Sequence, residues 1–145
     1  MTWVVSQGIV VFFVLISLVH VYWAAGGQWA IEAVVPQVKG GEDGALRPAF
    51  KPSALATSAV AVALLVIAGL VSLRAGLFMA PIRHWALQWL ISAIAMLMFA
   101  RAIGDSNQVG FFKEKVASTF ARLDTLVYSP LCLILGAGLL VIAWV

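Results

Sequence analysis

The stretch TWVVSQGIVVFFVLISLVHVYWAA, from Thr2 to Ala25, decides the fold class because it contains no Lys, Arg, Asp or Glu. A helix needs roughly 20 mostly apolar residues to cross the hydrocarbon core of a membrane, and this stretch is long enough. No positive charge precedes its apolar run, which is longer than that of a signal peptide. We therefore expect a retained membrane helix and not a cleaved leader.

Three further stretches have the same character, at about residues 53–73, 84–104 and 125–145, with Arg101 near the end of the second of these. None of the four alternates polar and apolar residues with a period of two, which excludes a lipid-facing barrel. The sequence therefore predicts an all-α integral membrane four-helix bundle. It forms a single domain over residues 1–145, with its first span at about residues 2–25.

The composition agrees with this class, since 63% of the residues are hydrophobic and 10% are charged. Soluble domains carry about a quarter charged residues, so a soluble or disordered chain is excluded. The net charge of +3 is too small for a polyanion-binding patch, and we expect no nucleic-acid partner. The single cysteine, Cys132, excludes a disulfide framework, and we expect it to be a buried packing residue. No histidine spacing suits zinc or a haem, so neither a metal nor a cofactor is predicted.

Four spans place both ends of the chain on one face of the membrane, here called side A, together with the connection 74–83. Side B then holds the two longer connections, 26–52 and 105–124. Membrane loops rich in Lys and Arg face the cytoplasm. Side A has Arg74 and Arg83, whereas side B has Lys39, Arg47, Lys51, Arg101, Lys113, Lys115 and Arg122. We therefore expect the inner (plasma) membrane of a bacterium, with both termini periplasmic or extracellular.

Small residues recur along one face of each span, which is typical of close helix packing in a membrane. The small-residue face of the second span also permits a homodimer. In the side-B connections, residues 29–35 suggest a short interfacial helix that ends before Pro36, and residues 40–44 a flexible tip. Helical spacing of apolar residues predicts an amphipathic surface helix that carries Phe112, Val116, Phe120 and Leu123.

Polar groups gather at one depth. A helix rises about 1.5 Å per residue, so His20, Arg101 and Tyr128 lie roughly 24 to 26 Å from side A along three different helices. Polar residues inside a membrane are costly and are often functional. The candidate ligand-binding residues at or near this level are His20, Trp23, Trp29, Glu32, Arg101, Asp105, Asn107, Asp124 and Tyr128.

Two of these candidates have ordinary structural alternatives. His20 can simply bond a backbone carbonyl or a serine, although its titration range also suits proton or ligand work. Arg101 can extend to lipid headgroups. It can instead pair inward with Asp124, or with Asp105 four residues along its helix.

Several motifs resemble a family of small bacterial four-span membrane proteins that is known only as a domain of unknown function. The resemblance covers nearly the whole chain and implies a membrane bundle whose side-B residues form one unit, but it implies no activity. The motifs are His20-Val21-Tyr22-Trp23-Ala24-Ala25-Gly26-Gly27-x-Trp29, Pro36, Ala100-Arg101-Ala102-Ile103-Gly104-Asp105, Gly110-Phe111-Phe112 and Asp124-Thr125-x-x-Tyr128-Ser129-Pro130-Leu131-Cys132.

Three functions fit the sequence. The first is binding of an amphipathic small molecule or a lipid headgroup in a polar pocket at the side-B interface, with membrane lipids as the natural partners. The second is a membrane enzyme of isomerase or reductase type that acts on a lipid-soluble substrate, with His20, Asp124 and Tyr128 as acid–base groups. The third is a structural or transport subunit, which the gathering of polar residues at one end disfavours. No catalytic residue is assigned.

Overall fold

Long apolar helices dominate the computed structural model, which describes residues 2–40, 44–104, 109–113 and 118–145. They are α1 (Thr2–Ala24), α3 (Ala54–Ala75), α4 (Trp85–Ile103) and α6 (Ser129–Trp144). The last continues a short helix, α5 (Thr119–Leu123), through a π-helical turn, η1 (Asp124–Tyr128), so the apolar helix runs from Thr119 to Trp144. In the described part of the chain, these four helices are long and apolar enough to cross a membrane. The predicted all-α fold is confirmed, and the chain is a multi-pass membrane protein.

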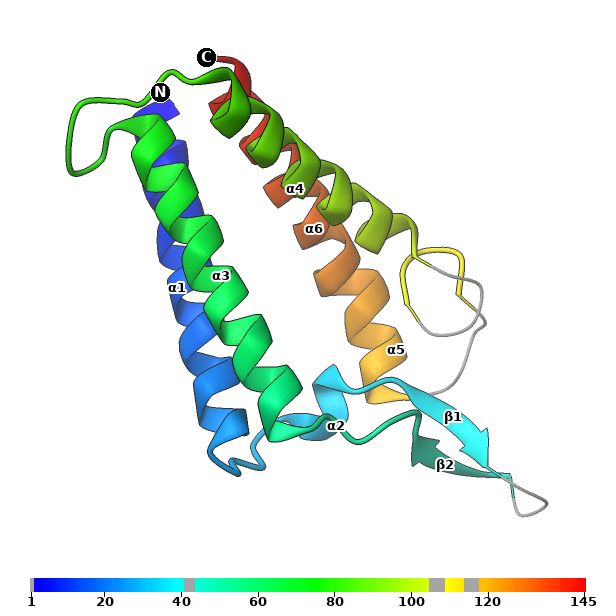
Figure 1. Ribbon diagram of the computed structural model, residues 1–145. Coiled ribbons are helices and arrows are strands. Elements are labelled where there is room, and N and C mark those ends of the chain that lie inside the picture. Colours follow the sequence, from blue (N-terminus) through cyan, green and yellow to red (C-terminus); the bar gives the residue numbers. More distant parts are fainter. Residues whose placement is uncertain (1, 41–43, 105–108, 114–117) are drawn as a thin grey trace.

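The four helices form two antiparallel pairs, α1 with α3 and α4 with α6 (Figure 1). The pairs meet near side A and spread apart toward side B in the view of Figure 1. The buried core lies in the side-A halves of the helices, because apolar side chains from all four meet there. Its members are Ile9, Phe13, Ala68, Val71, Ile91, Ile94, Ala95, Leu135, Leu139, Ile142 and Ala143.

Small and polar residues line the contacts between helices, as the sequence predicts. Ser17 of α1 is fully buried and donates a hydrogen bond of 2.8 Å to the carbonyl of Ala61 on α3. Ser92 of α4 accepts a hydrogen bond of 3.2 Å from the indole of Trp144. The predicted packing stripe of the second span is wrong at its side-B end, where Ala54 and Ser58 are exposed. Cys132 is only partly buried.

Both arginines of side A bind the end of α6. Arg74 donates to the carbonyls of Ile142 and Ala143 at 3.3 and 2.7 Å, and Arg83 donates to Val145 at 2.7 Å. The last carbonyls of a helix lack partners within the helix, and cations are favoured beside them. These two cations therefore join the hairpins at side A.

The first side-B connection contains a short helix, α2 (Ile31–Val34), which confirms the one expected within residues 29–35. It also contains a hairpin that the sequence pattern did not predict. In this hairpin, β1 (Gln37–Gly40) pairs with β2 (Ala45–Pro48). Strands of four residues give almost no periodic signal, which explains the omission. Of the predicted tip, residues 41–43 lie outside the described residues.

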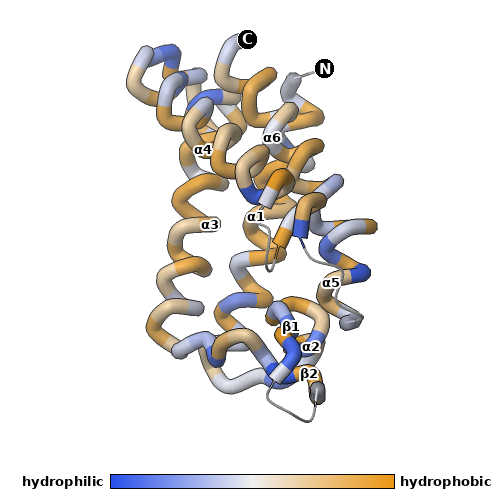
Figure 2. Tube along the Cα trace, turned by 90° about the vertical axis from the view of Figure 1, so that its right-hand side faces the viewer, coloured by the Kyte–Doolittle hydropathy of each residue, from blue (hydrophilic) through white to orange (hydrophobic). Residues whose placement is uncertain are grey.

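The predicted amphipathic helix of the second connection is wrong at its start, since Phe112 lies in a turn. Phe120 and Leu123 are helical, but they belong to α5, which continues into the fourth span. Val116 lies outside the described residues. In Figure 2, which colours the chain by hydropathy, apolar residues predominate along the long helices, and hydrophilic residues are concentrated at the helix ends and in the connections.

Candidate functional site

A π-helical turn at the side-B end of the fourth span organises the site. Pro130 has no N–H to donate to the carbonyl of Leu126, four residues earlier. One residue earlier, the N–H of Ser129 bonds the carbonyl of Asp124, five residues away, instead of that of Thr125. The carbonyls of Thr125 and Leu126 therefore both lose their α-helical donors. Single π turns within α-helices are frequent at functional sites.

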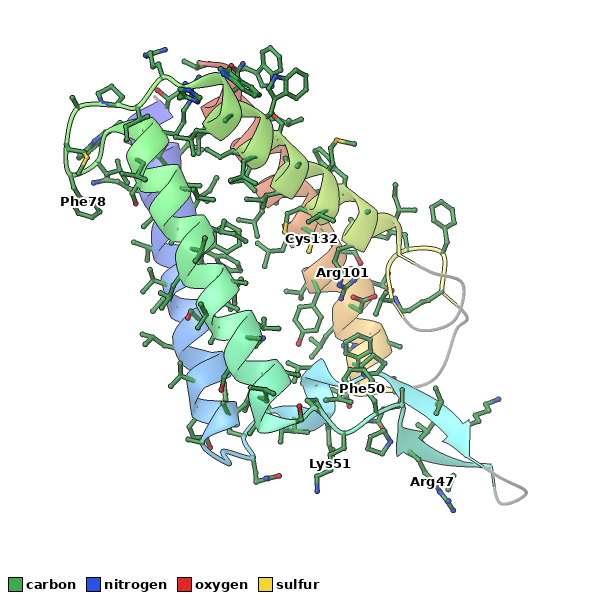
Figure 3. All side chains as sticks on the ribbon, viewed as in Figure 1. Arg47, Phe50, Lys51, Phe78, Arg101 and Cys132 are labelled. Carbon is green, nitrogen blue, oxygen red and sulfur yellow. The ribbon has the colours of Figure 1, made fainter. Side chains whose placement is uncertain are left out.

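Asp124, the first residue of this turn, is fully buried and its carboxylate has three donors. Arg101 Nη2 lies 2.6 Å from Oδ1, and Lys113 Nζ lies 2.8 Å from Oδ2. The backbone N–H of Gly110 also donates to Oδ2 at 2.7 Å. The predicted inward pair of Arg101 with Asp124 is thus present, and Figure 3 shows Arg101 beside the fourth span.

Lys113 was not among the candidate site residues, because in the sequence it is one cation of a long connection. Its side chain is only 6% exposed, and its ammonium group is fully used. Besides Asp124, it donates to the carbonyl of Gly110 at 2.9 Å and to the hydroxyl of Thr125 at 2.7 Å. The only sequence signal was its place in a segment that resembles the family, next to Gly110-Phe111-Phe112.

Two glycines let the second connection approach Asp124. Gly104 and Gly110 have φ values of +76° and +86°, which strain any residue with a Cβ. A Cβ on Gly110 would lie 2.5 Å from the Cα of Gly104, so the two backbones touch. The N–H of Phe111 then bonds the carbonyl of Ala102 at 3.0 Å. This close contact places the Gly110 N–H and the Lys113 side chain against the membrane helix.

Arg101, Lys113 and Asp124 are here called the ion cluster. Two buried polar atoms near it have no hydrogen-bond partner in the described structure. One is Nη1 of Arg101, and the other is Oγ of Ser129, whose residue is fully buried. A buried donor without a partner costs about 1–3 kcal/mol, and more when it is charged. The Arg101 side chain as a whole remains 31% exposed, although its Nη1 is buried.

Comparison with protein families gives a match over residues 13–139 to the family described as "Protein of unknown function (DUF3995)". The chain belongs to this family. The match agrees with the resemblance drawn from the motifs, and it covers the whole cluster from Arg101 to Ser129 of this DUF3995 protein. No curated protein matches the chain, and no solved structure does.

The other described candidates of this DUF3995 protein make their hydrogen bonds outside the cluster, and none of them is part of it. His20 Nδ1 lies 2.8 Å from the carbonyl of Ile16, and its ring packs edge-on against Trp23, as its ordinary structural role predicts. Trp23 Nε1 donates to the carbonyl of Trp29 at 2.8 Å. Glu32 is exposed on α2.

Tyr128 lies one turn from Asp124, but its hydroxyl donates to the carbonyl of Ala33 on α2 at 2.9 Å. It therefore joins the first side-B connection to the fourth span. Asp105 and Asn107 lie outside the described residues. Among the described residues, no three His, Cys, Asp or Glu side chains gather to hold a metal. Of the predicted set, the structure brings together Arg101 and Asp124, and it adds Lys113 and Gly110.

Proposed function

We propose that this membrane protein binds the anionic head of an amphipathic molecule, such as an acidic lipid, at its side-B interface. The observation that carries the proposal is the free Nη1 of Arg101 beside a cluster with excess positive charge. Within the described part of the cluster, Arg101 and Lys113 together carry two positive charges, and the buried Asp124 supplies one negative charge. A ligand with an anionic group balances the remaining charge.

The guanidinium has the geometry for this role. One of its nitrogens, Nη2, is held by Asp124 at 2.6 Å, which fixes the plane of the group. The ligand would bond the second nitrogen, Nη1; because this atom is buried, the groups that cover it must shift to admit the ligand. A fixed guanidinium loses little side-chain entropy when an anion arrives, and it binds carboxylates and phosphates with directional hydrogen bonds. The π turn supports the site, because it places Asp124 against α4.

Acidic lipids are the favoured class because the site lies at the end of membrane helices. The chain of such a ligand stays in the hydrocarbon while its head meets Arg101. We further propose that the protein lies in a bacterial inner membrane with side B toward the cytoplasm. The excess of Lys and Arg on side B supports that orientation, and the cytoplasmic leaflet is a source of anionic headgroups.

The test compares dioleoyl phosphatidylglycerol with dioleoyl phosphatidylcholine, which share their chains and differ in head charge. Native mass spectrometry of the purified protein in detergent gives the affinity for each lipid. We expect the wild type to prefer phosphatidylglycerol. Arg101→Lys keeps a cation for Asp124 but has no Nη1, so its affinity for phosphatidylglycerol should fall roughly tenfold or more, as for loss of a charged hydrogen bond.

Arg122→Gln is the matched control, because it removes an exposed cation from α5 without touching the cluster. It should keep the preference. Inorganic phosphate added as a competitor distinguishes the two sources of an anion: displacement of the lipid at millimolar phosphate indicates a site for free anions and overturns the lipid assignment. An unchanged preference in Arg101→Lys, with a normal circular dichroism spectrum, overturns the role of Arg101.

A further inference from the structure

The turn after α1 folds Trp29 back onto the end of its own helix. Trp23 Nε1 donates to the carbonyl of Trp29 at 2.8 Å, and the N–H of Trp29 points to the hydroxyl of Tyr22 at 3.5 Å. A Cβ on Gly27 would lie 2.6 Å from Cδ1 of Tyr22, so glycine lets the ring lie against the turn. These contacts account for the Tyr22-Trp23 and Gly26-Gly27-x-Trp29 motif, which the ion cluster does not use.

A groove of about 570 Å³ results, lined by Leu15, Leu18, Val19, Tyr22 and Trp29. The four lining residues that belong to α1 follow helical spacing, so they share one face of that helix. They are Leu15, Leu18, Val19 and Tyr22. That face lies opposite Ser17, which packs against α3, so the groove opens on the membrane-facing side of the helix. Leu15, Leu18 and Trp29 are all exposed.

We propose that this groove binds one acyl chain of a phospholipid in the side-B leaflet. It lies on a membrane span without charged residues, so hydrocarbon chains are the medium that surrounds it. The part of the groove nearer the membrane centre is lined by aliphatic side chains, and the part nearer side B is lined by Tyr22 and Trp29. Tyr and Trp side chains favour the level of the headgroups. From Leu15 to Tyr22 the helix rises about 10 Å, enough to guide the upper part of a chain. The volume falls within the range of roughly 300–1,000 Å³ typical of small-molecule sites.

The groove is independent of the proposed anion site. It is built from α1 and the turn that follows, whereas Arg101 and Asp124 belong to the other helix pair. The turn that carries its upper wall is ordered before any lipid arrives, since Trp23 bonds the backbone carbonyl of Trp29 and Gly27 accommodates the Tyr22 ring. A preformed site spends little free energy on ordering its walls. Recognition here depends on the chain, so a zwitterionic lipid binds as well as an anionic one.

The experiment uses dioleoyl phosphatidylcholine as the probe and native mass spectrometry of the full chain in detergent as the readout. Wild type should retain one phosphatidylcholine per chain. Leu18→Trp fills the groove with a larger side chain, and Trp29→Ala removes its upper wall. Both should lose most of the bound lipid. Neither change alters the buried core, so the folded state persists and a circular dichroism spectrum can verify it.

Matched controls carry the same substitutions at exposed membrane-facing positions away from the groove, Leu97→Trp on α4 and Trp85→Ala at side A. These controls, and Arg101→Lys, should retain the lipid. Retention by Leu18→Trp and Trp29→Ala at the wild-type level overturns the proposal. Equal loss in Leu97→Trp and Trp85→Ala also overturns it, as does the absence of bound lipid in the wild type. Loss of phosphatidylglycerol preference in Arg101→Lys with normal phosphatidylcholine retention separates the anion site from this one.

Discussion

Arg101 of α4 and Asp124 of the π turn lie 2.6 Å apart, and Asp124 is completely buried between Arg101 and Lys113. Since two cations and one backbone N–H share a single carboxylate, that carboxylate joins α4, the second connection and the fourth span. A buried ion pair offsets the cost of removing its charges from water only when all of its members are present. Removal of the Asp124 charge would therefore leave the buried Lys113 and the partly buried Arg101 without their counter-ion.

Asp124→Asn tests this consequence. The amide keeps the shape of the side chain but leaves Arg101 and Lys113 without their counter-ion. Breaking a buried pair by removing one partner costs about 3–5 kcal/mol. We expect a much lower thermal unfolding midpoint in detergent than for the wild type. Glu32→Gln is the control, because Glu32 is exposed on α2 and its replacement should change little. Equal midpoints for the two variants would refute the central role of Asp124.

Gly110→Ala tests the close backbone contact. Gly110 has a φ of +86°, and an added Cβ would meet the backbone of Ile103 and Gly104. The connection must then move, which weakens the Gly110 N–H bond to Asp124. A strained backbone position costs about 1–3 kcal/mol, so the unfolding midpoint should fall. Gly69→Ala serves for comparison, because a Cβ there meets open space in the middle of α3. That variant should be at least as stable as the wild type, and a similar fall in both variants would contradict the explanation.

Tyr128→Phe tests the link between the first side-B connection and the fourth span. The change removes the hydrogen bond of 2.9 Å to the carbonyl of Ala33 and leaves the ring in place. Loss of about 1 kcal/mol corresponds to roughly fivefold faster amide hydrogen exchange in α2 if α2 opens locally. Mass spectrometry of the peptide that covers residues 31–36 measures this rate of hydrogen exchange. Tyr22→Phe should leave this peptide unchanged, because its hydroxyl lies near Trp29. If Tyr128→Phe also leaves it unchanged, the link does not hold α2.

Accessibility of single cysteines tests the proposed orientation. In a Cys132→Ala background, Lys51→Cys reports on side B and Phe78→Cys on side A; both positions are exposed and lie at opposite ends of the molecule (Figure 3). With a membrane-impermeant maleimide on intact cells, only Phe78→Cys should react, because side B is proposed to face the cytoplasm. After lysis both should react. Reaction of Lys51→Cys alone on intact cells would reverse the orientation.

The sequence by itself was sufficient for the four helices. Long uncharged stretches such as residues 2–25 leave the backbone one way to satisfy its hydrogen bonds inside a membrane, which is a helix. The same reasoning placed Arg101 near the side-B end of its helix, and it lies in the last turn of α4. Small residues such as Ser17 and Ala61 also indicated contact faces correctly, since close packing in a membrane selects them.

Only the tertiary structure decided which polar groups meet. Arg101 had three plausible environments in the sequence, and the choice of Asp124 depends on how α4 packs against the fourth span. Gly110 and Lys113 lie in a turn, where the helical spacing predicted from Phe112 onward does not hold, so no pattern placed them beside Asp124. His20, at the same depth as Arg101, bonds its own helix instead. Helical rise gives a residue's height in the membrane, but its partners depend on rotation about the helix axis and on the path of the connections, and both are set by contacts between distant parts of the chain.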